Sequence, residues 1–395
     1  MLILLITVCI FDPADKFLGL KMPLFALGWI LFIFDITANR KSVYVPKNMI
    51  MYLLLFILIP LVSIAYYSFT GCDFVHYDGY QYFKAYLFIT IVPILYISKI
   101  DLIKPTVAII SALSILAIII LIISYFNISL IMNIFGEVGQ RYGILSIGSR
   151  IYGGFVLPNL PAVYFHTSEL IVFPIGYFTM KFIHSKRVSR TLYGFLLVIN
   201  IVAMFFSATR NNIMACILVP IFIASWYSKR KILVLCIFIL LSVLCIQNLD
   251  VIKNSVLRAD SRSEQYKISF FKDYLSLFAD EKVLLFGQGL GSYFNTTMRG
   301  YVSLTELTYF EFIRRFGLIL SLSSFALFLY PLSKLRLKKY HSMQYLFIVY
   351  LYFLIMSFFN PLLMSSSGML LLSIVLSKTF SPVSPSYIRQ SYVST

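Results

Sequence analysis

Apolar runs recur along almost the whole chain and are separated by short polar connections. Most of these runs approach the roughly 20 residues that a helix needs to cross a bilayer. The first run is short, so it forms either a half-length helix or part of a broken one. The pattern predicts twelve spans, at about 1–11, 21–37, 49–69, 82–99, 105–126, 160–182, 190–207, 211–227, 231–247, 308–331, 343–360 and 363–378.

The composition places the chain in lipid. Of its 395 residues, 60% are hydrophobic and only 12% are charged, which excludes an ordinary soluble globule. Lipid requires each segment to satisfy its own backbone polar groups, and no alternating ten-residue strand pattern recurs, so helices are expected and a barrel is not. We therefore predict an all-α, polytopic membrane helix bundle. Residues 1–380 form this single domain, and 381–395 form a disordered cytoplasmic tail.

Basic residues orient the predicted bundle. The short connections on one side are basic, as at Arg40–Lys47, Lys99–Lys104 and Lys186–Arg190, which marks that side as cytoplasmic. Both termini then lie in the cytoplasm, and two long loops, at about 127–159 and 248–307, lie outside. The formal charge of +17 is mainly this orientation signal. The bilayer is an expected partner because the chain is written in apolar spans. Nucleic acid is not expected, because the basic residues form no continuous stripe.

The first outer loop is rich in glycine and contains GEVGQRYGILSIGSRIYGGFVLPN. Glycine lets the backbone bend closely around a ligand. Arg141 and Arg150 lie in this stretch, and their planar guanidinium groups suit phosphate oxygens. We assign both to a pyrophosphate site. Pairing with lipid headgroups or with Glu137 is the alternative.

Two ionisable residues follow in the expected 160–182 span. His166 and Glu169 are three residues apart, so they would share one helix face. Ionisable groups within a span are costly and mark functional sites. We assign Glu169 to catalysis and His166 to substrate binding, with a structural hydrogen bond between them as the alternative.

The turn SATRNN carries the next outer candidates. Arg210 is its only basic residue and breaks the positive-inside pattern, and Asn211 follows it directly. This placement indicates capture of an anionic headgroup, with Arg210 in catalysis and Asn211 in binding. An arginine that merely extends from a helix end to the interface is the alternative.

The second outer loop begins with a helix and ends in a glycine turn. Its apolar spacing predicts an amphipathic helix on the bilayer surface, with mixed charges on a solvated face, at Tyr266, Phe270, Phe271, Tyr274, Leu275 and Phe278. The following GQGLGS lacks the spacing and context of a dinucleotide-binding loop. It predicts a tight loop whose amides face the site, so we assign Gln288, Gly289 and Ser292 to substrate binding.

The last outer stretch leads into the 308–331 span. Ser303 and Glu306 have capping-box spacing, which makes Glu306 both a structural candidate and our first candidate for catalysis. Glu311 can pair with Arg315 or Arg314, which leaves at least one arginine unneutralised near the membrane surface. We assign four residues of this stretch to substrate binding: Tyr309, Glu311, Arg314 and Arg315.

Four motifs in this order carry a family resemblance: YGGFVLPN, SATRNN, LLFGQGLGSYF and TELTYFEFIRRFGL. With the spans and the late outer loop, the chain resembles the Wzy-type polymerases of bacterial O-antigen and capsular polysaccharide, which share a superfamily with O-antigen ligases. The ligase relatives usually carry histidine and asparagine where this chain has Thr305-Glu306-Leu307. This departure favours a polymerase and leaves the general base open.

The resemblance implies a glycosyltransferase of the bacterial inner membrane with its active face in the periplasm. Such enzymes join oligosaccharide repeat units carried on undecaprenyl pyrophosphate, and the further partners that the resemblance implies are a chain-length regulator and a flippase. Fixed cations can stabilise the pyrophosphate, so no metal and no cofactor is expected. Arg150, Arg210 and one of Arg314 and Arg315 would supply them.

The general base and the class of function stay open in the sequence. The acceptor hydroxyl needs a base, for which Glu306 comes first, followed by Glu169 and Glu311. A transporter or flippase would instead use His166 and Glu169 as a proton relay, and its charges would lie deep within several spans. The pattern also leaves room for an O-antigen ligase or for a non-catalytic scaffold.

Overall fold

The computed structural model describes residues 1–40, 43–70, 76–148, 162–207, 209–227, 262–337, 341–358 and 360–380. The structure is mostly helical, at 79%, and the few strands in its described parts form two small two-stranded sheets. This agrees with the predicted all-α class. The expected 231–247 span and the predicted 381–395 tail lie outside the described residues.

A helix occupies part of each of the remaining eleven expected spans. These helices are α1 (Leu2–Phe11), α2 (Lys21–Ala38), α3 (Lys47–Thr70), α4 (His76–Leu87) continued by η1 (Phe88–Thr90) and α5 (Ile91–Ile97), α6 (Ile103–Phe126), α9 (Val172–His184), α10 (Arg187–Phe206), α11 (Arg210–Tyr227), α16 (Thr308–Leu337), α17 (His341–Met356) and α18 (Ser366–Phe380). Among the described residues, six helical segments are long and apolar enough to cross a membrane, namely Lys21–Ala38, Lys47–Tyr67, Asp78–Ile97, Ile103–Phe126, Arg187–Phe206 and Thr308–Arg336. The predicted number of twelve is therefore not confirmed.

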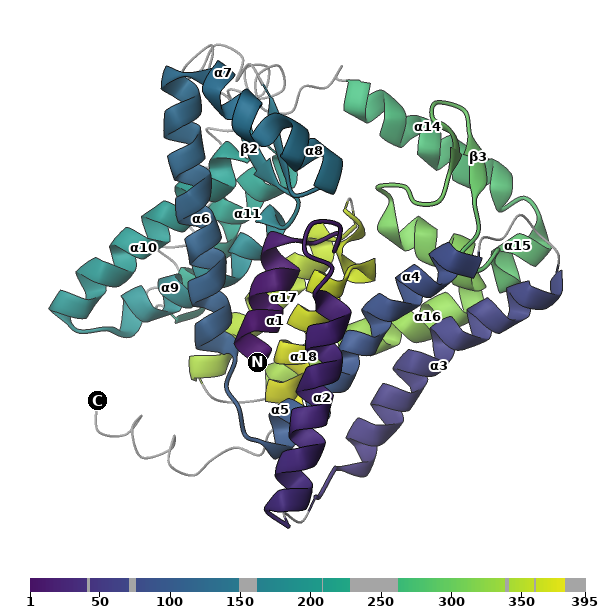
Figure 1. Ribbon diagram of the computed structural model, residues 1–395, viewed down its shortest axis with the longest axis horizontal. Coiled ribbons are helices and arrows are strands. Elements are labelled where there is room, and N and C mark those ends of the chain that lie inside the picture. Colours follow the sequence, from purple (N-terminus) through teal and green to yellow (C-terminus); the bar gives the residue numbers. More distant parts are fainter. Residues whose placement is uncertain are drawn as a thin grey trace.

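Helices that follow one another through a short connection pack side by side, as α9 and α10 do (Figure 1). The ring centroid of Tyr52, near the start of α3, lies 5.2 Å from that of Tyr330, in the last part of α16. The Tyr330 centroid lies 5.8 Å from that of Phe380, at the end of α18. At another place, His184 and Tyr227, near the ends of α9 and α11, approach to 4.9 Å between ring centroids. These aromatic contacts hold one end of the bundle together.

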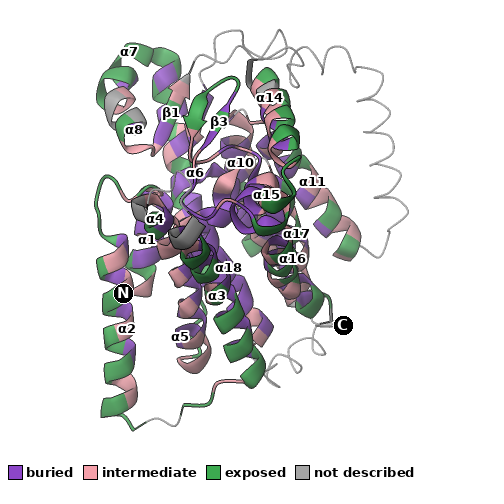
Figure 2. Ribbon diagram, turned by 90° about the vertical axis from the view of Figure 1, so that its right-hand side faces the viewer, coloured by how far each residue is buried: buried purple, intermediate pink, exposed green. Residues whose placement is uncertain are grey.

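The smaller elements gather at the opposite end, where Figures 1 and 2 show α7, α8, α14 and β3 beyond the long helices. They are α7 (Ile128–Ile131), η2 (Met132–Gly136), α8 (Glu137–Tyr142), β1 (Leu145–Gly148), β2 (Ala162–Phe165), η3 (Ser168–Ile171), α14 (Arg262–Leu277), α15 (Glu281–Phe286), β3 (Phe294–Thr296), β4 (Gly300–Val302) and η5 (Pro361–Met364). The described parts of the two predicted outer loops thus share one end of the bundle.

Helix α14 confirms the predicted amphipathic helix. Its buried face packs Phe270 and Tyr274 against Phe294 and Leu307, so it covers the loop that precedes α16. A second apolar row on α14, which includes Phe271, remains exposed. Its location at a bilayer surface stays a prediction.

The predicted helix over residues 160–182 is wrong in its first half. Ala162–Phe165 form strand β2, which pairs antiparallel with β1, and α9 begins only at Val172. Between them, His166 lies in a turn and Glu169 in the short η3 helix, so the two do not share a helix face. The β1 strand offers backbone partners to this segment, which local apolar content does not reveal.

Gly317 interrupts α16 with non-helical backbone angles of φ 70° and ψ 168°. The break frees the carbonyl groups of the preceding turn. The amide nitrogen of Gln288 binds the Arg314 carbonyl, and that of Gly289 binds the Arg315 carbonyl at 3.0 Å. The glycine loop is thus a tight loop, as predicted, but these two amides bind the broken helix.

We expect Gly317→Ala to destabilise the protein by more than about 2 kcal/mol, because alanine strains a positive φ and its methyl group would overlap the Leu285 carbonyl oxygen. Gly300→Ala is the matched control, since Gly300 also has a positive φ (66°) but has nothing near its missing Cβ. Thermal unfolding in detergent measures both. Equal losses would show that the close approach to α15 contributes nothing.

Candidate functional site

A cavity of about 1110 Å³ opens among the elements at the polar end of the bundle. It exceeds the roughly 300–1,000 Å³ that small-molecule sites usually enclose. Its wall is built from the α1–α2 connection, α4, β2, η3, the loop before α16 and the segment that leads into α18. The polar side chains of the wall include Lys16, Lys21, Asp78, Tyr82, Tyr164, His166, Glu169, Glu306, Asn360 and Ser366.

Three of the predicted site residues line this cavity: His166, Glu169 and Glu306. The other described candidates lie behind its wall or elsewhere, namely Arg141, Arg210, Asn211, Gln288, Gly289, Ser292, Tyr309, Glu311, Arg314 and Arg315. Arg150 lies outside the described residues. The tertiary structure therefore divides a set of residues that the sequence pattern assigns to one site.

Glu169 is completely buried beside the cavity. Its Oε1 accepts hydrogen bonds from the Tyr164 hydroxyl at 2.9 Å and from the Asn360 amide at 2.8 Å. Its Oε2 has no hydrogen-bond partner among the described residues. Burial raises the pKa of Glu169 to about 7, although hydrogen bonds from its own backbone and from Tyr164 oppose the shift. One carboxylate oxygen is thus held by two hydrogen bonds, while the other is buried without a partner among the described residues.

His166 does not form a hydrogen bond with Glu169, which was the structural alternative for this pair. Its backbone amide donates to the Ile144 carbonyl at 3.2 Å, and its ring packs edge-on against Tyr164 at 5.4 Å. Burial lowers the pKa of His166, which keeps the ring neutral near pH 7. His166 therefore offers the cavity a neutral imidazole.

Glu306 does not form the predicted capping box. The helix begins at Thr308, and the Thr305 hydroxyl accepts from the Leu307 amide at 3.3 Å. Instead, Glu306 Oε1 lies 3.3 Å from Arg299 Nη2, and Glu306 Oε2 lies 4.0 Å from Lys267 Nζ. The prediction failed because the helix starts later than the spacing from Ser303 requires.

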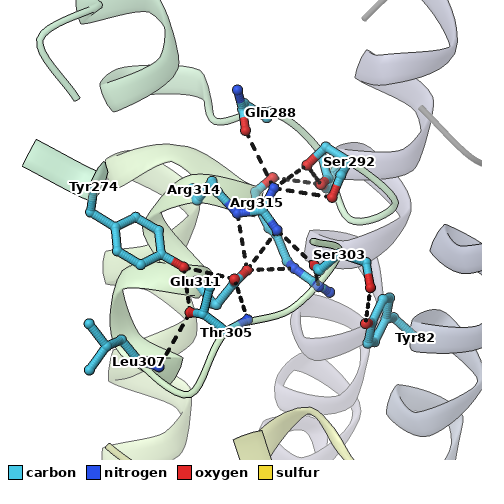
Figure 3. A network of polar contacts seen from close by, with 12 residues as sticks. Tyr82, Tyr274, Gln288, Ser292, Ser303, Thr305, Leu307, Glu311, Arg314 and Arg315 are labelled. Carbon is cyan, nitrogen blue, oxygen red and sulfur yellow. Dashed lines mark hydrogen bonds and ion pairs between the residues drawn. The ribbon is translucent and has the colours of Figure 1, made fainter. Parts of the chain in front are cut away.

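The predicted site residues Glu311, Arg314 and Arg315 are buried and form a polar network, which Figure 3 shows from close by. Glu311 Oε2 accepts from Arg314 Nη2 at 2.8 Å and from Arg315 Nε at 3.0 Å. Its Oε1 accepts from the Tyr274 hydroxyl at 2.7 Å and from the Thr305 amide at 2.8 Å. The predicted pairing is confirmed for both arginines, and one carboxylate indeed leaves a positive charge in excess.

The same network fixes the surrounding loops. Arg314 donates to the Ser292 hydroxyl at 2.8 Å and to the Ser303 carbonyl at 2.9 Å. Arg315 lies over the Tyr82 ring, 3.9 Å from its centroid. Tyr309, at the start of α16, donates to the Leu354 carbonyl at 2.7 Å. These contacts account for Ser292, Tyr309, Arg314 and Arg315 as residues that hold the outer loops on the bundle.

Arg210 lies at the start of helix α11 and does not line the cavity. It is the first residue of that helix, and its charge helps to lower the pKa of Lys267, after the larger effect of burial. Two residues on, the Asn212 amide donates to the Ser168 hydroxyl at 3.3 Å, next to Glu169. Arg210 and Glu169 are therefore held on adjoining segments. Arg141 is exposed on α8.

The cavity residues that the sequence pattern did not single out include Lys21 and Asn360. Lys21 is buried, and its ammonium group donates to the Ser366 hydroxyl at 2.8 Å and to the Pro13 carbonyl. Its sequence signal was a lysine directly before an apolar run. Asn360 is the last residue of the expected 343–360 span and precedes Pro361, so its sequence signal was only that of a residue at a helix boundary. Ser366, which Lys21 contacts, and Glu169, which Asn360 contacts, both lie far away in the sequence.

No family model, curated protein or solved structure matches the chain.

Proposed function

We propose that the chain is a membrane glycosyltransferase that joins oligosaccharide repeat units carried on undecaprenyl pyrophosphate. The observation that carries this proposal is the buried carboxylate of Glu169, which faces a cavity of about 1110 Å³ with one oxygen unpaired among the described residues. The order of the sequence motifs supports a Wzy-type polymerase of O-antigen or capsule. An O-antigen ligase is a close alternative within the same chemistry.

Glu169 is the proposed general base. Its pKa of about 7 leaves a substantial ionised fraction at neutral pH while keeping the carboxylate basic enough to accept a proton. Tyr164 and Asn360 orient Oε1, so Oε2 can accept the proton of an acceptor sugar hydroxyl. Glu306 is less suitable as the base, because Arg299 and Lys267 already engage both of its oxygens.

The proposed step balances as a simple transfer. The acceptor hydroxyl oxygen forms a bond to the anomeric carbon of the donor glycan while its proton passes to Glu169. The bond from that carbon to the pyrophosphate oxygen breaks, and undecaprenyl pyrophosphate leaves with the electron pair. Positive charge near the leaving group stabilises it. The products are one lengthened glycan on the acceptor lipid and one free lipid pyrophosphate.

The proposed site lies on the periplasmic face of a bacterial inner membrane, in a bundle of about twelve spans with both termini in the cytoplasm. This orientation follows from the basic connections, such as Arg40–Lys47 and Lys99–Lys104, which adjoin the ends of α2 and α5. Strand β2, which contributes Tyr164 to the cavity wall, lies toward the other end of the bundle, where α14 and β3 also lie (Figure 1).

The proposal is tested with the full-length protein purified in detergent. We expect it to elongate lipid-linked oligosaccharide when no membrane barrier is present, and gel analysis of the glycans measures the products. A transporter would give no elongation under these conditions. A ligase would transfer the glycan to lipid A core and leave lipid-linked units unjoined, so parallel reactions with each acceptor separate the two enzymes.

A further inference from the structure

Ser366 and Lys21 form a hydrogen-bonded pair in the wall of the cavity. Lys21 Nζ lies 2.8 Å from Ser366 Oγ, and both residues line the cavity of about 1110 Å³. Lys21 is only 3% exposed, whereas Ser366 is half-buried. A serine that shares a hydrogen bond with a lysine is one of the arrangements that activate a nucleophile. The proposed glycan transfer uses neither side chain.

The Lys21 amine is held among neutral oxygens. Besides Ser366 Oγ, its Nζ contacts the Pro13 carbonyl oxygen. The carboxylates of the same connection bind backbone amides: Asp12 accepts from three amides of the turn that follows it, and Asp15 Oδ1 accepts from the Lys21 amide at 3.2 Å. A buried lysine with neutral partners can act as a general base in its unprotonated form. In that form, Nζ can still donate to Pro13 while its lone pair accepts from Ser366.

Backbone contacts fix the position of the serine relative to the lysine. Ser366 is the first residue of α18, and directly before it Ser365 Oγ accepts from the Gly368 amide at 3.0 Å. Directly after it, the Ser367 hydroxyl donates to the Cys9 carbonyl of α1 at 2.6 Å. Since α1 leads into the connection that carries the lysine, these contacts tie both partners to one another before a substrate binds.

The start of α18 also supplies donors for a negatively charged oxygen. The first backbone N–H groups of a helix have no partner within it and form the positive end of the helix dipole. In α18 these groups include the amides of Ser366 and Ser367, and both residues belong to the cavity wall. An oxyanion that forms when Ser366 attacks a carbonyl group would therefore have amide donors and a favourable dipole at hand.

We propose that Ser366 is a nucleophile with Lys21 as its general base, and that the cavity thereby hydrolyses carboxylic esters, an activity separate from glycan transfer. The Ser366 oxygen forms a bond to the ester carbonyl carbon while its proton passes to Lys21. The bond from that carbon to the alcohol oxygen breaks, and the alcohol leaves with the proton from Lys21. Water then attacks the acyl-serine, which releases a carboxylic acid and restores the hydroxyl. One ester and one water thus give one acid and one alcohol.

A fluorophosphonate probe tests the nucleophile, because it transfers a phosphonyl group to an activated serine. With the full-length protein purified in detergent, mass spectrometry should locate this group on Ser366, and Ser366→Ala should stay unlabelled. Lys21→Arg should slow labelling by about 10²- to 10⁴-fold, since arginine stays charged and cannot take the proton. Ser303→Ala removes another hydroxyl of the cavity wall, so it is the matched control and should be labelled like the wild type.

Hydrolysis of p-nitrophenyl acetate should follow the same pattern as labelling. A wild type that is neither labelled nor hydrolytic, a label on a different residue, full labelling of Lys21→Arg, or an equal loss in Ser303→Ala would each overturn the proposal. Lys21→Met removes the amine and serves if the arginine variant does not fold. Thermal unfolding of Ser366→Ala separates lost chemistry from lost structure, because the variant should melt like the wild type while it loses both activities.

Discussion

Replacing Glu169 by glutamine is expected to lower glycan elongation by about 10²- to 10⁴-fold, the contribution of a positioned general base. Glutamine keeps the size of the side chain and can still bond to Tyr164 or Asn360, so the cavity should survive the change. The measurement is elongation of lipid-linked oligosaccharide by the purified variant. Glu281→Gln, at an exposed position on α15, is the control and should retain full activity.

The same residue predicts a pH dependence. Because burial raises the pKa of Glu169 from 4.5 to about 7, its basic form accumulates only as the pH rises through about 7. Elongation by the wild type should therefore increase across that interval, and the residual activity of Glu169→Gln should not follow this limb. Wild-type product lengths from Glu169→Gln, or an unchanged pH profile, would refute the assignment of the base.

The raised pKa also has a consequence for stability. Below pH 4.5, Glu169 is protonated in both the folded and the unfolded protein, and its contribution to the free energy of unfolding is fully present. That contribution is lost as the pH rises through about 7, because the unfolded chain ionises more readily than the buried carboxyl. Relative to the wild type, Glu169→Gln should thus gain thermal stability more at about pH 8 than at about pH 5. An equal difference at the two pH values would show that Glu169 is not buried as an acid.

Replacing Glu311 by alanine should destabilise the protein by about 3–5 kcal/mol, because it leaves two fully buried arginines without their carboxylate. It also removes the acceptor for Tyr274 and for the Thr305 amide, so the loops around α16 should loosen together (Figure 3). Thermal unfolding and protein level in the membrane measure the loss. Glu281→Ala is the exposed control and should change stability little.

A combined variant distinguishes a structural network from a ligand site. Replacing Glu311, Arg314 and Arg315 together by apolar residues of similar size should recover part of the stability lost in Glu311→Ala, since no unpaired buried charge remains. If Glu311→Ala instead kept normal stability and lost only elongation, the carboxylate would be functional, as the sequence pattern predicts.

The local hydrophobic and charge pattern of the sequence predicted most of the helices and the ion pairs of Glu311. Apolar runs of near-spanning length placed the helices, and apolar spacing from Tyr266 to Phe278 placed α14. The pairing of Glu311 with Arg314 and Arg315 was also predictable, because residues three and four apart adjoin on a helix. In each case the partners lie within a few turns of one another.

Only the tertiary structure decided which of the polar residues share a cavity. Strand β2 forms because β1 meets it, and Glu169 is bound by Asn360, which is 191 residues away in the chain. Glu306 is engaged by Lys267 and Arg299 and does not cap the helix. Sequence spacing specifies neighbours along one helix, but these partners meet only when separate segments pack. The sequence therefore determined the helices and the charge types, and packing determined where they act.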